Sequence, residues 1–165
     1  MLIALTRPVS PSLARCELTH LAREPIDVAR AATQHAAYER LLASCGATLV
    51  RVPAAPESPD AVFIEDTAVV VDEVAVLARP GALSRRAEPA AVAAALAAYR
   101  PVRAITAPGT LDGGDVLRLG RTLHVGRSSR TNDEGIGQLR GLVAPFGYAV
   151  VPVEVTGCLH LKSAV

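Results

Sequence analysis

Leu111-Asp112-Gly113-Gly114-Asp115 decides the fold of this chain, because a matching acidic stretch, Phe63-Ile64-Glu65-Asp66-Thr67, comes about 45 to 50 residues earlier. Each stretch precedes two short apolar runs, and a Ser-Arg pair follows each set of runs, first Ser84-Arg85 and then Ser129-Arg130. Self-similarity at this period is typical of repeat architectures in which one unit cannot bury its apolar face alone. The sequence therefore predicts a series of similar α/β units.

The apolar pattern around these stretches predicts strand, helix and strand in a recurring order. In the first unit the strands are expected at residues 2–5 and 47–52. A helix between them is expected to begin near Pro25 and to end before Gly46. The face of this helix that is expected to meet the core carries Val28, Ala32, His35, Tyr38, Leu42 and Cys45.

The second and third units are predicted to share one plan, in which a two-stranded hairpin is followed by a helix and a further strand. Pro89 is expected to open the helix of the second unit. The strands expected in these two units lie at residues 68–71, 74–78, 102–106, 116–119, 122–125 and 148–153.

Two local patterns mark the third unit and the residues after it. Thr131 and Glu134 have the spacing of a capping box, which predicts the start of the third helix. Residues 158–165 alternate in polarity and predict a strand, with His160 and Cys158 on the face opposite the neighbouring leucines. At this period the 165 residues hold about three units and the start of a fourth.

Composition restricts the classes of partner. The net charge is +1, only 3% of the residues are aromatic and none is Trp, so neither a nucleic-acid surface nor a base-stacking platform is expected. The longest apolar run, residues 90–99, is too short to span a membrane, and no export signal follows Met1. Three cysteines suit free thiols in a reducing compartment, so the expected location is cytoplasmic.

The two acidic loops are the strongest candidates for chemistry, because the repeat places them at the same end of successive units. Carboxylates gathered around one centre need a cation, which can be a metal ion or a positively charged substrate. Ordinary turn chemistry is the competing interpretation, since Asp and Gly are common in hairpin loops. Histidine pairs with ligand spacing and Cys-x-x-Cys motifs are both absent from the sequence, so no metal and no cofactor are expected.

Arg85 and Arg130 recur after the hairpins as the acidic residues recur before them. A guanidinium group binds a carboxylate through forked, charge-assisted hydrogen bonds. Acidic loops for a cation and arginines for an anion together suit a zwitterion such as an amino acid. The competing interpretation is that these arginines belong to the solvated surface.

These residues resemble the motifs of the dimethylarginine dimethylaminohydrolase family, which belongs with arginine deiminases and amidinotransferases to the guanidino-group-modifying (pentein) superfamily. The resemblance implies an α/β propeller of five ββαβ units around a central site. Of these units the chain, as a single partial domain over residues 1–165, would hold about three in an open arrangement. The strings that match in order and spacing are Phe63–Asp66, Arg79–Gly81, Leu111–Val116, Ser129–Asn132 and Leu159–Ser163.

The resemblance implies hydrolysis of dimethylarginine to citrulline and dimethylamine, with no metal or cofactor. In the family a cysteine thiolate attacks the guanidinium carbon and forms a thiouronium, which water then hydrolyses. The resemblance implies that Glu65 and Asp66 bind the guanidinium and that His160 is the general acid and base. Asp112 would orient that histidine and contact the substrate. Asp60 would bind the α-amino group, Arg85 and Arg130 would bind the α-carboxylate, and Leu18 would lie in a mobile loop over the pocket.

The chain departs from the family at the nucleophile, which lies near the C-terminus of longer members. None of Cys16, Cys45 and Cys158 matches it, so this chain alone is expected to be inactive. An open propeller would expose strand edges, and a homo-oligomer is therefore expected. Two alternatives stay open: a non-catalytic guanidino-amino-acid binder or assembly fragment, and an arginine deiminase-like hydrolase.

Overall fold

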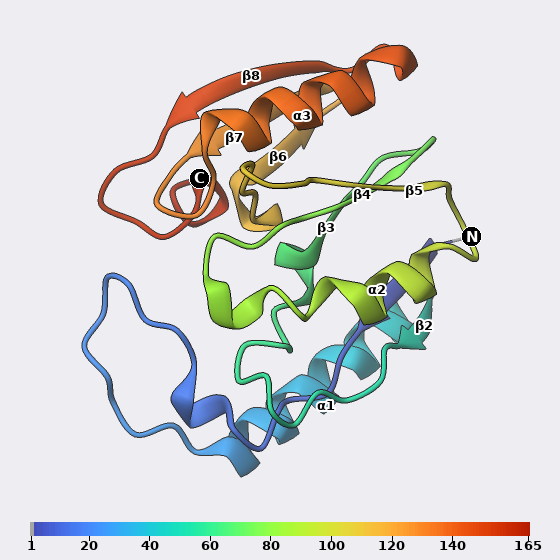
Figure 1. Ribbon diagram of the computed structural model, residues 1–165. Coiled ribbons are helices and arrows are strands. Elements are labelled where there is room, and N and C mark those ends of the chain that lie inside the picture. The colour runs from blue at the N-terminus through green and yellow to red at the C-terminus, as the bar shows by residue number, and fades with distance from the viewer. Residues whose placement is uncertain (1) are drawn as a thin grey trace. The chain divides into compact units, whose positions relative to one another are not determined.

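A computed structural model describes residues 2–165, and the chain divides into two compact units, one up to Ile64 and one from Glu65 onward (Figure 1). In the first unit β1 (Leu2–Thr6) and β2 (Ala47–Arg51) run parallel and are joined by α1 (Val28–Ser44). The Asp27 carboxylate caps this helix by accepting a hydrogen bond from the backbone N–H of Arg30 at 2.9 Å. The expected strand, helix and strand of the first unit are confirmed.

The predicted core face of α1 is only partly correct, because Val28, His35 and Leu42 are half-buried whereas the other three predicted positions are exposed. Tyr38 is 54% exposed and Cys45 is also exposed, whereas the buried residue of the helix is Glu39. Glu39 accepts hydrogen bonds from Thr6 Oγ1 at 2.7 Å and from Arg51 Nη2 at 2.7 Å, so polar contacts join α1 to its strands. The hydrogen bond from Arg51 is the main reason that the pKa of Glu39 falls to about 2. Two strands are too narrow to bury a helix of 17 residues completely, so Tyr38 and Leu41 stay exposed.

The second unit contains two sheets of identical topology, which confirms the predicted repeat. In each sheet an antiparallel hairpin is followed by a helix and by a third strand that runs parallel to the second strand of the hairpin. The first sheet is built from β3 (Ala68–Val70), β4 (Ala75–Leu77), α2 (Pro89–Leu96) and β5 (Val102–Ala104). The second is built from β6 (Val116–Leu119), β7 (Thr122–Arg127), α3 (Asp133–Val143) and β8 (Ala149–Glu154).

The core of the second unit lies between these sheets and their helices. In Figure 1 α3 runs along the sheet of β6, β7 and β8. Its apolar positions Ile136, Leu139 and Val143 fall at helical spacing and are at most 2% exposed. Fully burying one such side chain contributes about 1.5 to 3 kcal/mol, so this face anchors the loops at the end of the sheet.

The predicted capping box of α3 is wrong. The N-cap is Asn132, whose Oδ1 accepts hydrogen bonds from the backbone N–H groups of Gly135 and Thr110, both at 2.8 Å. The hydroxyl of Thr131 instead donates to Asp115 Oδ2 at 2.7 Å. The Thr131 hydroxyl bonds the Asp115 carboxylate and does not cap the helix, because a charged acceptor makes the stronger hydrogen bond.

The strand predicted over residues 158–165 is also wrong. These residues form bends and the short 3₁₀ turn η6 (Leu161–Ser163). The backbone N–H of Leu161 donates to Asp115 Oδ1 at 3.0 Å, so it is not available to a strand partner. The turn buries both His160 and Leu161, whereas a strand would place them on opposite faces.

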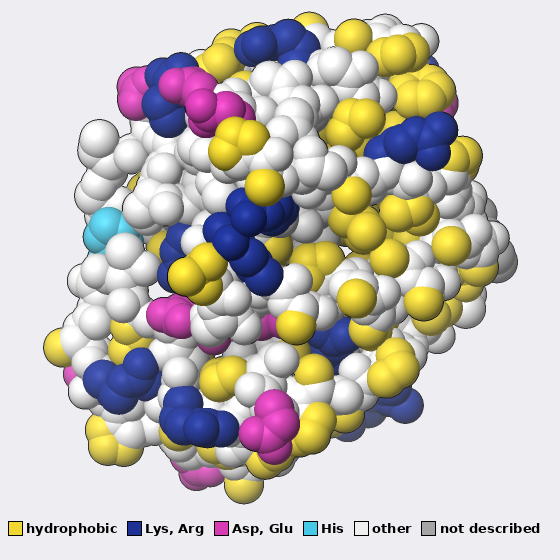
Figure 2. All heavy atoms as spheres, viewed as in Figure 1, with side chains coloured by type: hydrophobic (Ala, Val, Ile, Leu, Met, Phe, Trp, Pro, Cys, Tyr) yellow, Lys and Arg dark blue, Asp and Glu magenta, His cyan; other side chains and the backbone are white. Residues whose placement is uncertain are grey.

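Within residues 2–165 no helix combines the length and the apolar character that crossing a membrane requires. Basic and acidic side chains are interspersed on the face in view in Figure 2, in agreement with the net charge of +1.

Candidate functional site

Three short 3₁₀ turns position the candidate site. Asp66 lies in η2 (Ile64–Thr67), Asp112 directly precedes η4 (Gly113–Asp115), and His160 directly precedes η6. The first two turns are the acidic loops of the repeat, and each leads straight into the first strand of a hairpin. The strands are anchored in the core, so the turns are held where their side chains meet.

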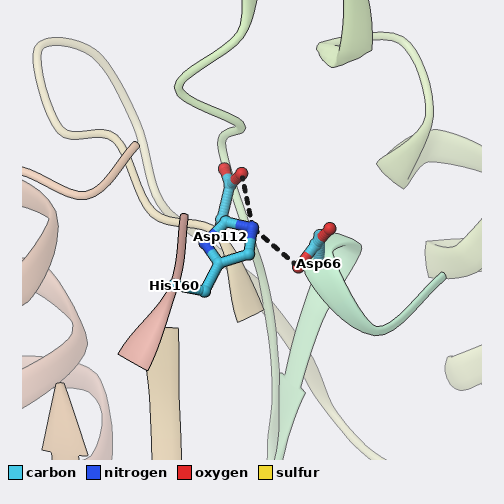
Figure 3. Close-up of side chains that lie close together, drawn as sticks. All are labelled: Asp66, Asp112 and His160. Atoms are coloured by element: carbon cyan, nitrogen blue, oxygen red, sulfur yellow. Dashed lines mark ion pairs between the residues drawn. The ribbon is translucent and has the colours of Figure 1, made fainter. Parts of the chain in front are cut away.

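Asp66, Asp112 and His160 form a buried cluster (Figure 3). His160 Nε2 lies 3.7 Å from Asp66 Oδ1 and 3.9 Å from Asp112 Oδ2, so one ring nitrogen faces two carboxylates. None of the three residues is more than 8% exposed. The structure thus brings together three of the residues singled out from the sequence, although 94 positions separate the first from the last.

The Asp112 carboxylate is only partly satisfied. Its Oδ1 accepts a hydrogen bond from the backbone N–H of Gly81 at 2.9 Å, whereas its buried Oδ2 has no hydrogen-bond partner among residues 2–165. Arg130 Nη1 lies 3.8 Å from Oδ2, within ion-pair range. Burial, with the nearby charge of Asp66, raises the pKa of Asp112 to about 6 despite the hydrogen bond from Gly81. This oxygen therefore favours a proton or an added cation.

Asp115 supports His160 from the opposite side of the ring, and no role was assigned to it from the sequence. Its Oδ2 lies 3.5 Å from His160 Nδ1 and accepts hydrogen bonds from the hydroxyls of Ser128 and Thr131 at 2.6 and 2.7 Å. Asp112 and Asp115 are the same residue type in one short motif, so the sequence alone does not show which of them lies against His160. The role predicted for Asp112 in orienting His160 stays a prediction, and Asp115 holds the nearer position.

The His160 ring stays protonated to a higher pH than an ordinary histidine does. Burial lowers the pKa of His160, but the Asp115 carboxylate 3.5 Å from its Nδ1 and the charges of Asp66 and Asp112 raise it by more. The net effect is a raised pKa. A protonated imidazole can donate from Nε2 into the space that Asp66 and Asp112 border.

Gly114 lets the turns approach closely. Its backbone N–H donates to Asp66 Oδ1 at 3.0 Å. A Cβ at this position would lie 2.7 Å from His160 Cδ2 and 2.8 Å from Asp66 Oδ1, closer than real Cβ contacts. The second glycine of the motif is therefore required by packing inside the cluster.

Arg85 is buried behind Asp66. Its Nη1 donates to Asp66 Oδ2 at 2.7 Å, and its Nη2 donates to Glu88 Oε2 at 2.9 Å. Glu65, the neighbour of Asp66, is exposed, and its Oε1 pairs with Lys162 Nζ at 2.6 Å. The substrate contacts predicted for Glu65, Arg85 and Arg130 stay predictions.

Asp60 and Leu18 belong to the first unit. The Asp60 carboxylate is 5% exposed and accepts hydrogen bonds from the backbone N–H of Glu17 at 3.1 and 3.2 Å. It therefore fixes the loop that carries Leu18, which is 38% exposed. The predicted contact of Asp60 with a substrate α-amino group and the predicted place of Leu18 in a mobile loop over the pocket stay predictions.

The cluster has a donor set that a metal ion could use, but it contains no cysteine. One ligand atom from each of Asp66, Asp112 and His160 lies within 4.8 Å of the others. Of the three cysteines, only Cys158 lies in the second unit, and its Sγ is 3.5 Å from the carbonyl oxygen of His160. Among the described residues, the cluster thus offers acid–base and cation-binding groups.

The curated relatives that match most of this chain include two enzymes of the same name. The family models searched give no match. A curated dimethylarginine dimethylaminohydrolase of Streptomyces coelicolor is 48% identical over 98% of this chain and 63% of its own length, so the chain spans less than two thirds of this relative. The curated enzyme of the same name from Pseudomonas aeruginosa is 36% identical over 83% of this chain and 55% of its own length.

The solved structures agree. A cysteine-to-serine variant of the Pseudomonas aeruginosa protein, complexed with citrulline, matches with a TM-score of 0.91 and 34% identity over 96% of this chain and 62% of its own. An α/β propeller fold is therefore shared with structures of this group.

Proposed function

Because this chain belongs to the dimethylarginine dimethylaminohydrolase family of the pentein superfamily, we propose that it acts in the hydrolysis of dimethylarginine to citrulline and dimethylamine. The observation that carries this proposal is the buried cluster in which His160 Nε2 faces the carboxylates of Asp66 and Asp112. Its charge and its proton chemistry both suit a guanidinium that is to lose an amine.

The buried charges around the cluster favour a cation. Four buried carboxylates, of Asp66, Glu88, Asp112 and Asp115, outnumber the two buried guanidinium groups of Arg85 and Arg130 with which three of them pair. Clustered carboxylates repel one another, and a bound cation relieves both the repulsion and the cost of burying them. A substrate guanidinium keeps its positive charge at any working pH. Its N–H groups would donate to Asp66 and to Asp112 Oδ2, which accepts no hydrogen bond from residues 2–165.

His160 supplies the proton that the reaction needs. In the proposed first step a cysteine thiolate forms a bond to the guanidinium carbon, and the bond from that carbon to dimethylamine breaks as His160 Nε2 gives the leaving nitrogen its proton. In the second step water attacks the thiouronium carbon and gives one proton to His160 and the other to solvent, while the C–S bond breaks to release citrulline and the cysteine thiolate. The raised pKa of His160 keeps the proton-donating form populated near neutral pH.

The thiolate is the part that the cluster does not supply. Cys158, the cysteine of the second unit, is held at the His160 carbonyl, and neither Cys16 nor Cys45 belongs to that unit. A non-catalytic guanidino-amino-acid binder is thus the second candidate function, favoured by the lack of a cysteine in the cluster over residues 2–165. Both functions share the guanidinium site.

The remaining predictions concern the rest of the substrate and the assembly. We propose that Arg85 and Arg130 bind the α-carboxylate and that Asp60 binds the α-amino group. Leu18 would lie in a mobile loop over the pocket. The titles of structures in this group name citrulline and S-methyl-L-thiocitrulline as ligands, which supports an amino acid with a guanidino-like end. A homo-oligomer and a cytoplasmic location stay predictions.

Calorimetry with dimethylarginine and arginine tests the proposal. The chain is expected to bind both ligands, and Asp66→Asn is expected to weaken binding by about 30-fold, because it removes one charge of a buried ion pair worth at least about 2 kcal/mol. Asp133→Asn, a change of the same kind at an exposed carboxylate, is the matched control and should bind like the parent. The chain alone should release no citrulline. A lack of binding would refute the guanidinium site, and turnover would refute the assignment of the thiolate outside this chain's cysteines.

Guanidinium binding should also depend on pH. Since the pKa of Asp112 is about 6, its carboxyl is largely protonated at pH 5 and must lose a proton before it can pair with a cation. Affinity for arginine should therefore rise by up to about tenfold per pH unit below this pKa and level off above it. Titrations at pH 5, 6, 7 and 8 measure this change. An affinity that is flat from pH 5 to 8 would contradict the role given to Asp112.

A further inference from the structure

Glu88 lies at the far end of a buried line of charges that leads to the cluster. It is 3% exposed, precedes the first residue of α2, and faces Arg85, which is 4% exposed. Arg85 in turn faces Asp66. Burying a carboxylate and a guanidinium this completely is costly unless the geometry is specific, so the arrangement needs an explanation.

The Arg85 guanidinium is held like a fork. Its Nε lies 3.2 Å from both Glu88 oxygens and its Nη2 lies 2.9 Å from Glu88 Oε2, so one edge of the planar group is committed to Glu88. The opposite nitrogen, Nη1, is thereby directed at Asp66 Oδ2, 2.7 Å away. Because the group is rigid, fixing one edge fixes the direction of the other.

Asp66 then presents its second oxygen to the cluster. Oδ1 accepts the hydrogen bond from Gly114 at 3.0 Å and lies 3.7 Å from His160 Nε2. With one oxygen held by Arg85 and the other by a backbone N–H, the carboxylate has no rotational freedom. The direction in which Asp66 meets a ligand is thus set by Arg85.

The charge of Glu88 has a second effect. If Arg85 faced Asp66 alone, the two would neutralise each other, and the attraction of the cluster for a cation would fall. Glu88 already balances the Arg85 charge, so Asp66 keeps its negative charge for a ligand. The hydrogen bonds that Arg85 donates to Glu88, together with the charge of Asp66, also outweigh burial and raise the pKa of Arg85, which keeps its guanidinium ionised.

We propose that Glu88 is a positioning residue of the guanidinium site, acting through Arg85 to orient Asp66 and to preserve its negative charge. This inference rests on the proposed function for the ligand that Asp66 binds. It assigns Glu88 no contact with substrate.

The test compares Glu88→Gln, which has the same shape without the charge, with Glu134→Gln, an exposed glutamate in the first turn of α3. Arginine binding is measured by calorimetry and the His160 titration by NMR in the same chain. Glu88→Gln is expected to weaken arginine binding about tenfold, a loss of about 1.4 kcal/mol, and to lower the His160 pKa, because the cluster loses negative charge. Glu134→Gln should change neither.

The outcomes separate this inference from the proposed function. If the parent chain binds no arginine, the proposed function fails, while a lower His160 pKa in Glu88→Gln still supports the relay of charge. If the parent binds and folded Glu88→Gln binds and titrates like it, the inference is wrong, even if that variant is less stable. Should Glu88→Gln not fold, Glu88→Asp decides. Its shorter carboxylate cannot reach both Arg85 nitrogens, so about threefold weaker binding is expected, and parent-like affinity would overturn the inference.

Discussion

Replacing Gly113 by alanine is expected to destabilise the second unit more than any other conservative change in the candidate site. A Cβ on Gly113 would lie 2.0 Å from the backbone oxygen of Glu65 and 3.2 Å from that of Ala68. Neither atom is the end of a flexible side chain, so the backbone of η2 or η4 must move. Overpacking a buried site typically costs 1 to 3 kcal/mol, and a clash with backbone should exceed about 3 kcal/mol.

Chemical denaturation followed by circular dichroism measures this loss. Gly137→Ala is the matched control, because Gly137 lies in α3 and a Cβ there would meet nothing within 4 Å. Alanine favours a helix over glycine, so the control should be stabilised by up to about 1 kcal/mol. Equal stability of Gly113→Ala and the parent would show that the two acidic turns are not in the close contact described.

The consequence for the site follows from the same contact. Gly113 allows η2 to lie against η4, which is what places Asp66 beside Asp112 and His160. A Gly113→Ala chain that still folds should therefore separate these carboxylates and bind arginine more weakly. Gly114 serves the side chains of the cluster, whereas Gly113 serves its backbone.

Asp115→Ala is expected to cost about 4 kcal/mol of folding free energy. The Asp115 carboxylate is fully buried and accepts hydrogen bonds from Ser128, from Thr131 and from the backbone N–H of Leu161, as well as facing His160 Nδ1. Each donor left buried without a partner costs about 1 to 3 kcal/mol. Its control is Asp133→Ala, an exposed carboxylate paired with Arg127, where the loss should stay below about 1 kcal/mol.

Asp115→Ala should also change how the stability of the fold depends on pH. The pKa of His160 is raised in the folded state, so its contribution to stability is complete below the unfolded pKa of 6.5 and is lost as pH rises through the folded pKa. The interaction with the Asp115 carboxylate beside Nδ1 is the largest of those that raise the pKa of His160. Asp115→Ala should lower the His160 pKa in an NMR titration and flatten the fall in stability above pH 6.5. An unchanged His160 pKa would rule out Asp115 as its support.

The sequence predicted the repeat, both hairpins, all three helices and the acidic loops, and the structure confirms them. It predicted less well wherever one side chain had several acceptors to choose from. Thr131 bonds Asp115 rather than capping α3, and Leu161 bonds the same carboxylate rather than extending a strand. The α1 face was only partly predicted for a different reason, because periodicity shows which residues share a face but not whether a sheet wide enough to bury that face is present.

What the sequence determined by itself is the set of local units and the end of each unit at which acidic residues gather, because apolar spacing, proline, glycine and turn residues act over a few positions. Only the tertiary structure decided which groups meet. It placed Asp115 against Leu161, 46 residues away, Gly114 against Asp66, 48 residues away, and Glu88 behind Arg85. These choices depend on how turns from different repeats pack together, and in a buried, low-dielectric site each donor takes the charged acceptor that the packing brings within reach.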